Sequence, residues 1–394
     1  MIIAKETNIN ILLEQYPECE EFLYPFLGIV ADETTIDKLA IANNVSCEAL
    51  ISGLERYLKR IEQNPCDFAQ MRNRLMKPGM VNIAGYTNFL LQDALFNELT
   101  KFADENNIPL NLNLFPKHEK KQFQNYLAVC NLADDLPDVF IGKGFSSLTT
   151  SRFFDKFIKP GLFTHLVDGI EIGEAFQNAG VNDRMQVYHA FGVEEAVMVY
   201  DKSINPMIPV PQSWKDILTE TYHDSLTQMG KSGQDHFGFI MMLYLYHEFG
   251  EEGIVRFASN VKSKQHFTHT IKNMGRKSEV VAPVNIMHRF AARFIRSEAR
   301  DTVQIVQTPE GNPAVCQFFL LKRDAPKEAV LMARHLHSEP IQERLEKCGI
   351  LPLSSFNAPP VRWIGWDTLR RFPLPYLKDH LAEIAYNHYK NAEI

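Results

Sequence analysis

Three short apolar runs alternate with two amphipathic stretches early in the chain, and this alternation constrains the fold more than any other feature. Strands joined by helices at this spacing form right-handed crossovers and a parallel sheet that is covered on both faces. Ligands of such sheets bind beyond the carboxyl ends of the strands. The periodicity predicts strands at 81–86, 110–115 and 139–141, with helices at 90–106 and 122–136 between them.

The third predicted strand leads into a glycine-containing loop and then into a helical pattern at 148–157. Gly142 and Gly144 allow backbone N–H groups to approach a ligand closely. The first turn of a helix offers unpaired donors and a positive dipole, and Lys143 adds a full charge. The segment is therefore either an anion-binding junction or an ordinary turn whose serines cap a helix.

Composition describes a globular chain of two or three domains. Of the 394 residues, 45% are hydrophobic and 23% are charged. No apolar run reaches the length of about 18 residues that a membrane span needs, and the start of the chain lacks the pattern of a signal peptide. We therefore expect a cytoplasmic protein. The 6 cysteines contain no C-x-x-C pair, which favours reduced thiols over disulfides or zinc.

Charge is distributed unevenly along the chain. Residues 1–62 hold 11 acidic against 5 basic residues, whereas the remainder is nearly balanced. Apolar residues at helical spacing in this stretch predict a small acidic helical domain that folds independently of the rest. A nucleic-acid partner is disfavoured, because phosphate binding needs a clustered basic excess.

The later part of the chain continues the alternation of strands and helices. Polar stretches marked by glycine or proline at 230–235 and 282–285 indicate openings before helices. Strands are predicted at 186–191, 196–201, 303–306 and 315–320, and helices at 237–249, 253–261 and 327–348.

Five segments carry a resemblance to a known family: PDVFIGKG (137–144), EEAVMVYDKS (194–203), VPQSWKDIL (210–218), HEFGEEGIVRFASNV (247–261) and the long stretch from VQIVQ to ILPL (303–353). In this order they resemble the type II periplasmic solute-binding proteins of ABC transporters, in the branch that includes ferric-iron and thiamine binders. The resemblance covers roughly residues 80–353. It implies an α/β fold of two lobes that are joined by strands and trap a ligand by hinge closure.

The acidic N-terminal stretch, from LLEQYPECEE (12–21) to Leu58, resembles a small helical domain of unknown function. That domain is found alone or ahead of redox and iron–sulfur-repair proteins. Some of its members carry paired cysteines after a glycine turn, but here the turn reads GIVA (28–31), so no redox role of such a pair is implied. We expect this all-α domain to dock a protein partner.

These patterns divide the chain into five parts. We expect the small helical domain at 1–62, a linker at 63–79, the first part of lobe 1 at 80–195, lobe 2 at 196–315, and a return to lobe 1 with C-terminal helices at 316–394.

The family geometry places the ligand between loop ends of the two lobes. The expected ligand-binding residues are Tyr86, Thr87, Asn88, Gly142, Lys143, Gly144, Ser146 and Ser147 on lobe 1, and Lys231, Ser232, Asp235 and Asn285 on lobe 2. No catalytic residue is predicted, because the chain has no G-x-S-x-G, G-x-x-x-x-G-K-[ST] or H-E-x-x-H motif.

The same resemblance provides a test for a metal site, because the ligands of the ferric-iron members can be looked for in this sequence. Ferric-iron members hold their metal through adjacent tyrosines, and the matching segment here (264–285) has no tyrosine. His266 and His269 share a helix face, but two ligands do not make a site. We therefore expect no metal and no cofactor, and an organic or oxyanionic ligand instead.

The leading hypothesis is a solute-binding receptor, a cytoplasmic sensor or carrier, that traps a small polar ligand, expected to be anionic, between its lobes. One alternative is an enzyme that uses the same fold for a biosynthetic or cofactor-dependent step. Another is the substrate-binding subunit of an ABC transporter for a metal or a small molecule.

Overall fold

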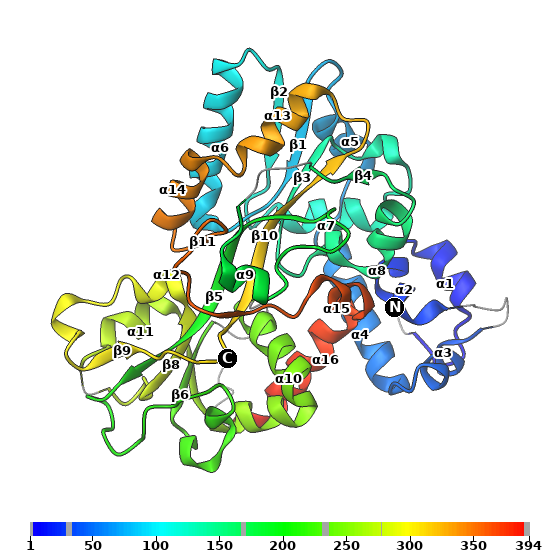
Figure 1. The fold of residues 1–394 in the computed structure, drawn as a ribbon. Helices are drawn as coiled ribbons and strands as arrows, with labels where there is room; N and C mark the ends of the chain where they lie inside the picture. Colours follow the sequence, from blue (N-terminus) through cyan, green and yellow to red (C-terminus); the bar gives the residue numbers. More distant parts are fainter. Residues whose placement is uncertain (1–2, 29–33, 167–170, 231–235, 277, 390–394) are drawn as a thin grey trace.

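The computed structural model describes residues 3–28, 34–166, 171–230, 236–276 and 278–389. Its main strands form one mixed sheet in the order β2-β1-β3-β10-β5-β8-β6-β7. The two lobes lie toward the two ends of this sheet, and short N-terminal helices, drawn in blue, lie beside the first lobe (Figure 1). The predicted α/β architecture with a small all-α N-terminal part is confirmed.

The first lobe is built on the parallel strands that the sequence predicts. β1 (Val81–Gly85) pairs with β2 (Leu110–Leu114) on one side and with β3 (Val139–Lys143) on the other. Helices α6 (Phe89–Glu105) and α7 (Lys120–Val129) make the crossovers. Every residue of β1 and β3 is buried, so both faces of this part of the sheet are covered.

Two long strands, β5 (His189–Asp201) and β10 (Asn312–Lys322), pass from one lobe into the other. β10 pairs with β3 and with the first half of β5, whereas the second half of β5 pairs with strands of lobe 2. The sequence predicts two strands where β5 is one. Gly192, Glu194 and Glu195 resemble a polar break in the pattern, but all of β5 is buried and the strand continues through them.

The second lobe adds four strands to β5. β8 (Val284–His288) and β9 (Val303–Ile305) pair with β5, β6 (Leu226–Met229) with β8, and β7 (Val261–Gln265) with β6. The interpretation of 282–285 as the opening of a helix is wrong. These residues lead into β8, which is buried throughout between two strands, so the polar Asn285 gave a misleading signal.

Helix α10 (His236–Asn260) is the long helix of lobe 2, and it breaks at Gly250, whose φ is 67°. This break agrees with the two helical stretches expected there. The predicted helix at 327–348 is divided into α13 (Lys327–His335) and α14 (Glu339–Lys347) around Leu336, and the helix at 148–157 is divided because Thr150 is extended.

The remaining elements are short. They are 3₁₀ or π segments (Ala133–Asp135, Ser147–Thr149, Phe154–Ile158, Asp216–Leu218, Glu220–Tyr222, Ser297–Ala299), strands β4 (Phe163–Thr164), β11 (Leu351–Pro352) and β12 (Val361–Arg362), and helices α8 (Ser151–Phe153), α9 (Glu174–Asn178), α11 (Phe267–Asn273), α12 (Arg289–Ala292) and α15 (Trp366–Arg371), followed by the longer C-terminal helix α16 (Leu374–His388).

The N-terminal module consists of α1 (Ile9–Gln15), α2 (Cys19–Leu27), α3 (Ile36–Ala42) and α4 (Cys47–Glu62). It lies against α8 and the C-terminal helix α16 (Figure 1). The rings of Phe22 and Phe26 contact Tyr376 of α16, with centroid distances of 6.3 and 5.4 Å. Arg60 makes two 2.9 Å hydrogen bonds to the carboxylate of Asp379. This apolar and ionic interface argues against the expected independence of the module.

The division of the chain into five parts stays a prediction, and the structure adds three facts to it. The stretch expected as a linker contains α5 (Phe68–Leu75). The boundaries at 195/196 and 315/316 fall inside the crossing strands β5 and β10. Helix α16 packs on α10 of lobe 2 as well as on the module.

Phe22→Ala tests whether the module belongs to the common core. Phe22 is fully buried between α4 and α16, so the truncation should lower the free energy of unfolding of the whole chain by about 3–5 kcal/mol. Urea denaturation measures this change. Ile41→Ala is the matched control, because Ile41 lies in the same module with 78% of its surface exposed. A separate early transition in Phe22→Ala, with the main transition unmoved, would show that the module unfolds on its own.

Candidate ligand-binding site

A buried ion pair lies where the crossing strands leave lobe 1. Lys143, the last residue of β3, places its Nζ 2.7 Å from Oε2 of Glu194 on β5. Both residues are buried. The strand pairing produces this contact, since β10 lies between β3 and β5. Lys143 pairs with Gln317 and Glu194 with Val315, two positions apart on β10, so the two side chains lie on the same face of the sheet. The charge of Lys143 is therefore already balanced within the protein.

Side chains from three further elements complete a network around Glu194. Gln317 of β10 donates from Nε2 to Oε1 of Glu194 and accepts at Oε1 from the hydroxyl of Thr87, 2.7 Å away. The side chain of Asn88 also hydrogen-bonds Glu194. Nδ1 of His288, at the end of β8, lies 3.9 Å from Oε2 of Glu194. The network thus joins both lobes and the loop after β1.

The network keeps its charges fixed near neutral pH. Burial alone would raise the pKa of Glu194, but the charge of Lys143 and the hydrogen bonds from Lys143 and Asn88 hold it below its ordinary value. Burial lowers the pKa of His288 to about 4 against the attraction of Glu194, and Lys143 lowers it further. Glu194 is consequently ionised and His288 neutral.

Several predicted binding residues therefore lie inside the protein rather than at an open surface. Thr87, Asn88 and Lys143 belong to the buried network. A Cβ on Gly142 would lie 2.4 Å from the ring of Phe318, so this glycine is needed for packing. Gly144 donates its N–H to the carbonyl of Cys316 at 2.8 Å and cannot offer it to a ligand.

A cavity of about 130 Å³ lies beside this network. Lobe 1 contributes Ser146 and Ser147 of the predicted set, together with Lys121 of α7. Ser146 is 6% exposed, and it lies at the start of the helical segment that follows β3. The junction after β3 therefore does face a space that could hold a polar group.

The walls opposite Ser146 and Ser147 come from other parts of the chain. The module contributes Glu21, Tyr57 and Arg60, and α16 contributes Lys378. Because these residues lie far from the junction in sequence, periodicity alone gave no signal for them. The sequence features that relate to this cavity are the acidic composition of residues 1–62 and the adjacent basic residues Lys120 and Lys121, and neither feature shows that the two regions lie together.

The electrostatics of the cavity are dominated by cations. Arg60 and Lys121 place positive charge near Lys378, an exposed residue whose negative neighbour is Asp379. Lys120 lies 3.8 Å above the ring of Tyr86, and burial, with Lys143 and Lys378 nearby, lowers its pKa to about 7. A bound anion would favour the charged form of both lysines.

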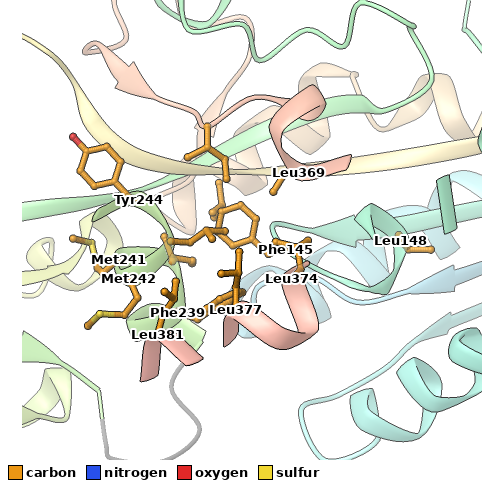
Figure 2. Packing of buried hydrophobic residues seen from close by; sticks show 14 of the residues in the cluster. Phe145, Leu148, Phe239, Met241, Met242, Tyr244, Leu369, Leu374, Leu377 and Leu381 are labelled. Carbon is orange, nitrogen blue, oxygen red and sulfur yellow. The ribbon is translucent and has the colours of Figure 1, made fainter. Parts of the chain in front are cut away.

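An apolar wall separates the cavity from the core of lobe 2. Phe145 of the junction, Phe239 of α10 and Leu374 of α16 line it, and the rings of Phe145 and Phe239 are 5.8 Å apart. Figure 2 shows Phe145 among side chains of α10 and α16, so the junction contacts both helices at this point. Trp363 stacks on Phe145 with a centroid distance of 6.0 Å.

The other predicted residues do not line the cavity. Tyr86 is buried behind it, and burial raises its pKa to about 12. Asn285 is fully buried within β8 and donates to the carbonyl of Ala282 at 2.9 Å. Lys231, Ser232 and Asp235 lie outside the described residues.

The histidine pair lies on α11 of lobe 2, outside the cavity. Nδ1 of His266 contacts the hydroxyl of Thr268 at 2.8 Å, and both histidines are exposed. In the ranges that the structure describes, no three histidine, cysteine, aspartate or glutamate residues are grouped so that they could hold a metal ion. In those same ranges no helix is long and apolar enough to cross a membrane.

Comparison with known proteins gives a family and a fold. The sequence profile of the family described as bacterial extracellular solute-binding protein matches residues 134–371. The structure resembles the Bordetella ferric binding protein, with 13% identity and a TM-score of 0.52 over 78% of this chain and 98% of that chain. It also resembles the Trichodesmium protein IdiA (FutA) in complex with iron and citrate, with 14% identity and a TM-score of 0.52 over 79% and 99% of the two chains.

A third similar structure is apo FutA2 from Synechocystis, at 13% identity with a TM-score of 0.53, over 80% of this chain and 100% of that chain. At these identities the likeness shows the fold alone, and it confirms the two-lobe type II architecture that the sequence segments suggest. No curated protein sequence matches this chain.

Lys143→Met tests the structural role of the ion pair. The substitution leaves Glu194 charged and buried without its partner, so the free energy of unfolding should fall by about 3–5 kcal/mol. The double variant Lys143→Met/Glu194→Gln should lose clearly less, because no charge is left unpaired. Urea denaturation of the three proteins measures both values. Equal losses in the single and double variants would contradict this role.

His288 should make the stability depend on pH. Its pKa is about 4 in the folded chain against an ordinary value of 6.5, so the unfolded chain binds the proton more tightly. Its contribution to stability is full above about pH 6.5 and falls by about 1.4 kcal/mol per pH unit until about pH 4. His288→Asn should flatten the curve of unfolding free energy against pH in that window. Parallel curves for the two proteins would contradict the prediction.

Proposed function

Since this chain belongs to the family of bacterial extracellular solute-binding proteins, we propose that it binds a small oxyanion or carboxylate in the cavity between its lobes. The proposal rests on one observation above all. Lys121, Arg60 and Lys378 line the same cavity as the hydroxyl groups of Ser146 and Ser147, so three cationic side chains and two hydroxyl donors meet in one space.

The size of the cavity supports a small ligand. Its volume of about 130 Å³ corresponds to about four water molecules in the liquid. A tetrahedral oxyanion or a short carboxylate fits such a space, and its oxygens would accept hydrogen bonds from the ammonium and hydroxyl groups. Charge-assisted hydrogen bonds of this kind are among the strongest in proteins.

The chemistry of the walls argues against a bare ferric ion as the solute, although several similar structures are named ferric binding proteins. A trivalent cation needs anionic oxygen ligands. Burial raises the pKa of both Tyr57 and Glu21, so neither oxygen is readily ionised, and three cationic side chains line the same space. The electrostatic field there would repel the metal.

The cellular location stays a prediction. A cytoplasmic location is one expectation, whereas the family is described as extracellular. Fractionation of cells that express the native gene, with mass spectrometry of the N-terminus, distinguishes the two. A processed chain outside the cytoplasm would support the substrate-binding subunit of a transporter, and an unprocessed chain in the cytoplasm would support a sensor or carrier.

Lys378→Met tests the proposed site. Loss of a charge-assisted hydrogen bond worth about 1.5–3 kcal/mol should weaken anion binding by about 10- to 150-fold. Titration calorimetry with sulfate, phosphate, oxalate and citrate measures the affinities of the wild type and the variant. Lys117→Met is the control, because Lys117 is exposed and does not line the cavity.

Two results would contradict the proposal. Tight binding of ferric ion in the absence of any anion would show that the solute class is wrong. Binding of an anion with equal affinity to wild type and Lys378→Met would show that the anion lies elsewhere.

A further inference from the structure

The N-terminal module forms one wall of the cavity. Glu21 on α2 and Tyr57 and Arg60 on α4 line it, opposite the junction of lobe 1. Two-lobe closure alone would leave this side open, because the lining residues outside the module come from the junction, α7, α10 and α16. The module therefore belongs to the site as well as to the packing of the chain.

Glu21 occupies a particular position in this wall. Its side chain is buried, with 5% of the residue exposed. The hydroxyl groups of Ser147 and Tyr57 lie within hydrogen-bonding reach of its carboxyl group. Ser147 opens the helical segment after β3, which is where the sequence predicts an anion. A carboxyl group of the module thus lies at the edge of the expected anion position.

Charged groups face Glu21 from every element packed around it. α2 itself adds Glu20, α4 adds Arg60, and the lobes add Lys121, Arg152 and Lys378. Two of these cations are directed elsewhere. Arg152 donates to Glu20 at 2.8 Å and to the carbonyls of Leu127 and Cys130, and Arg60 is held by Asp379.

The remaining compensation does not restore the ordinary pKa of the carboxyl group. Burial raises the pKa of Glu21, and this effect exceeds the opposing influence of Arg152, Ser147 and Tyr57. A neutral carboxylic acid differs from a carboxylate in one respect that matters here, because it can donate a hydrogen bond.

We propose that Glu21 binds the solute as a neutral carboxylic acid, donating a hydrogen bond to an oxygen of the anion while α2 and α4 close the cavity over it. The ligand class is a small anion with oxygen acceptors, and the inference rests on the proposed function. An ionised Glu21 would repel such an anion. A molecule whose Glu21 is ionised therefore takes one proton from solvent as the anion binds and returns it when the anion leaves.

The first part of the test needs no ligand. A carboxyl group with a raised pKa contributes full stability below its unfolded pKa and loses it as pH rises through the folded value. Glu21→Gln stays neutral at every pH, so its urea midpoint should equal that of the wild type near pH 5 and exceed it near pH 8. Glu20→Gln is the matched control. Although burial opposes ionisation, Lys156 and Arg152 hold the pKa of Glu20 low, so this variant should be less stable than the wild type near pH 8.

The second part measures proton uptake with sulfate, which does not titrate near neutral pH. Calorimetry near pH 8 in two buffers of different ionisation enthalpy gives the number of protons taken up on binding. Lys120 contributes to this number in both proteins, because burial lowers its pKa. The wild type should therefore take up as much as one proton more than Glu21→Gln.

The outcomes separate this inference from the proposed function. Sulfate binding with equal proton uptake in both proteins, when the urea midpoints also give no sign of a raised pKa of Glu21, would overturn the inference and leave the anion site standing. Equal midpoints of Glu21→Gln and wild type near pH 8 would overturn it as well. Absence of binding by sulfate, phosphate, oxalate and citrate in both proteins would overturn the anion site and the inference together.

Discussion

The contact between Lys143 and Glu194 is the interaction on which the two-lobe arrangement depends. It lies where β3, β10 and β5 run side by side, and its polar neighbours come from the loop after β1 and from β8 of the other lobe. A buried ion pair contributes little net stability, but a buried charge without its partner is very unfavourable. The strands can therefore adopt only a register that brings these side chains together, and that register fixes where the lobes meet.

This fixed centre leaves the binding surface to other residues. Because Lys143 and Gly144 are used for internal contacts, the hydroxyl groups of the next turn and the cations of α7, α4 and α16 face the cavity instead. The site thus combines one rigid wall, built on the crossing strands, with walls carried by helices from both ends of the chain. Helices that pack through side chains can shift more easily than strands that share backbone hydrogen bonds, so we expect opening and closing to occur on the helical side.

The sequence predicted the parts of this structure that depend on local patterns. β1, β2 and β3 were found because apolar runs alternate with amphipathic helices, and α10 because its stripe is long and Gly250 interrupts it. β8 was not predicted because it contains the polar Asn285. This side chain is buried in an apolar environment, where it donates hydrogen bonds to the carbonyls of Ala282 and Val199. Likewise, the residues around Lys143 give no sign that Glu194 is its partner, and those around Ser147 give no sign that Glu21 lies beside it. Long-range pairing of polar groups leaves no periodic pattern in the sequence. The sequence therefore indicated the junction after β3 as a candidate site but not the walls that the module and α16 add to the cavity.

The place of β10 in the sheet also affects how the protein is made. β10 lies between β3 and β5, although well over a hundred residues separate it in sequence from either neighbour. On the ribosome, β3 is therefore synthesised long before the strand that covers its edge. Phe140 and Ile141 have no strand partners on that side until Leu320 and Phe319 have been synthesised. An apolar strand with an open edge can pair with other chains during this interval. The edge of β3 is exposed to such pairing until lobe 2 has been completed and the chain has returned to the first lobe.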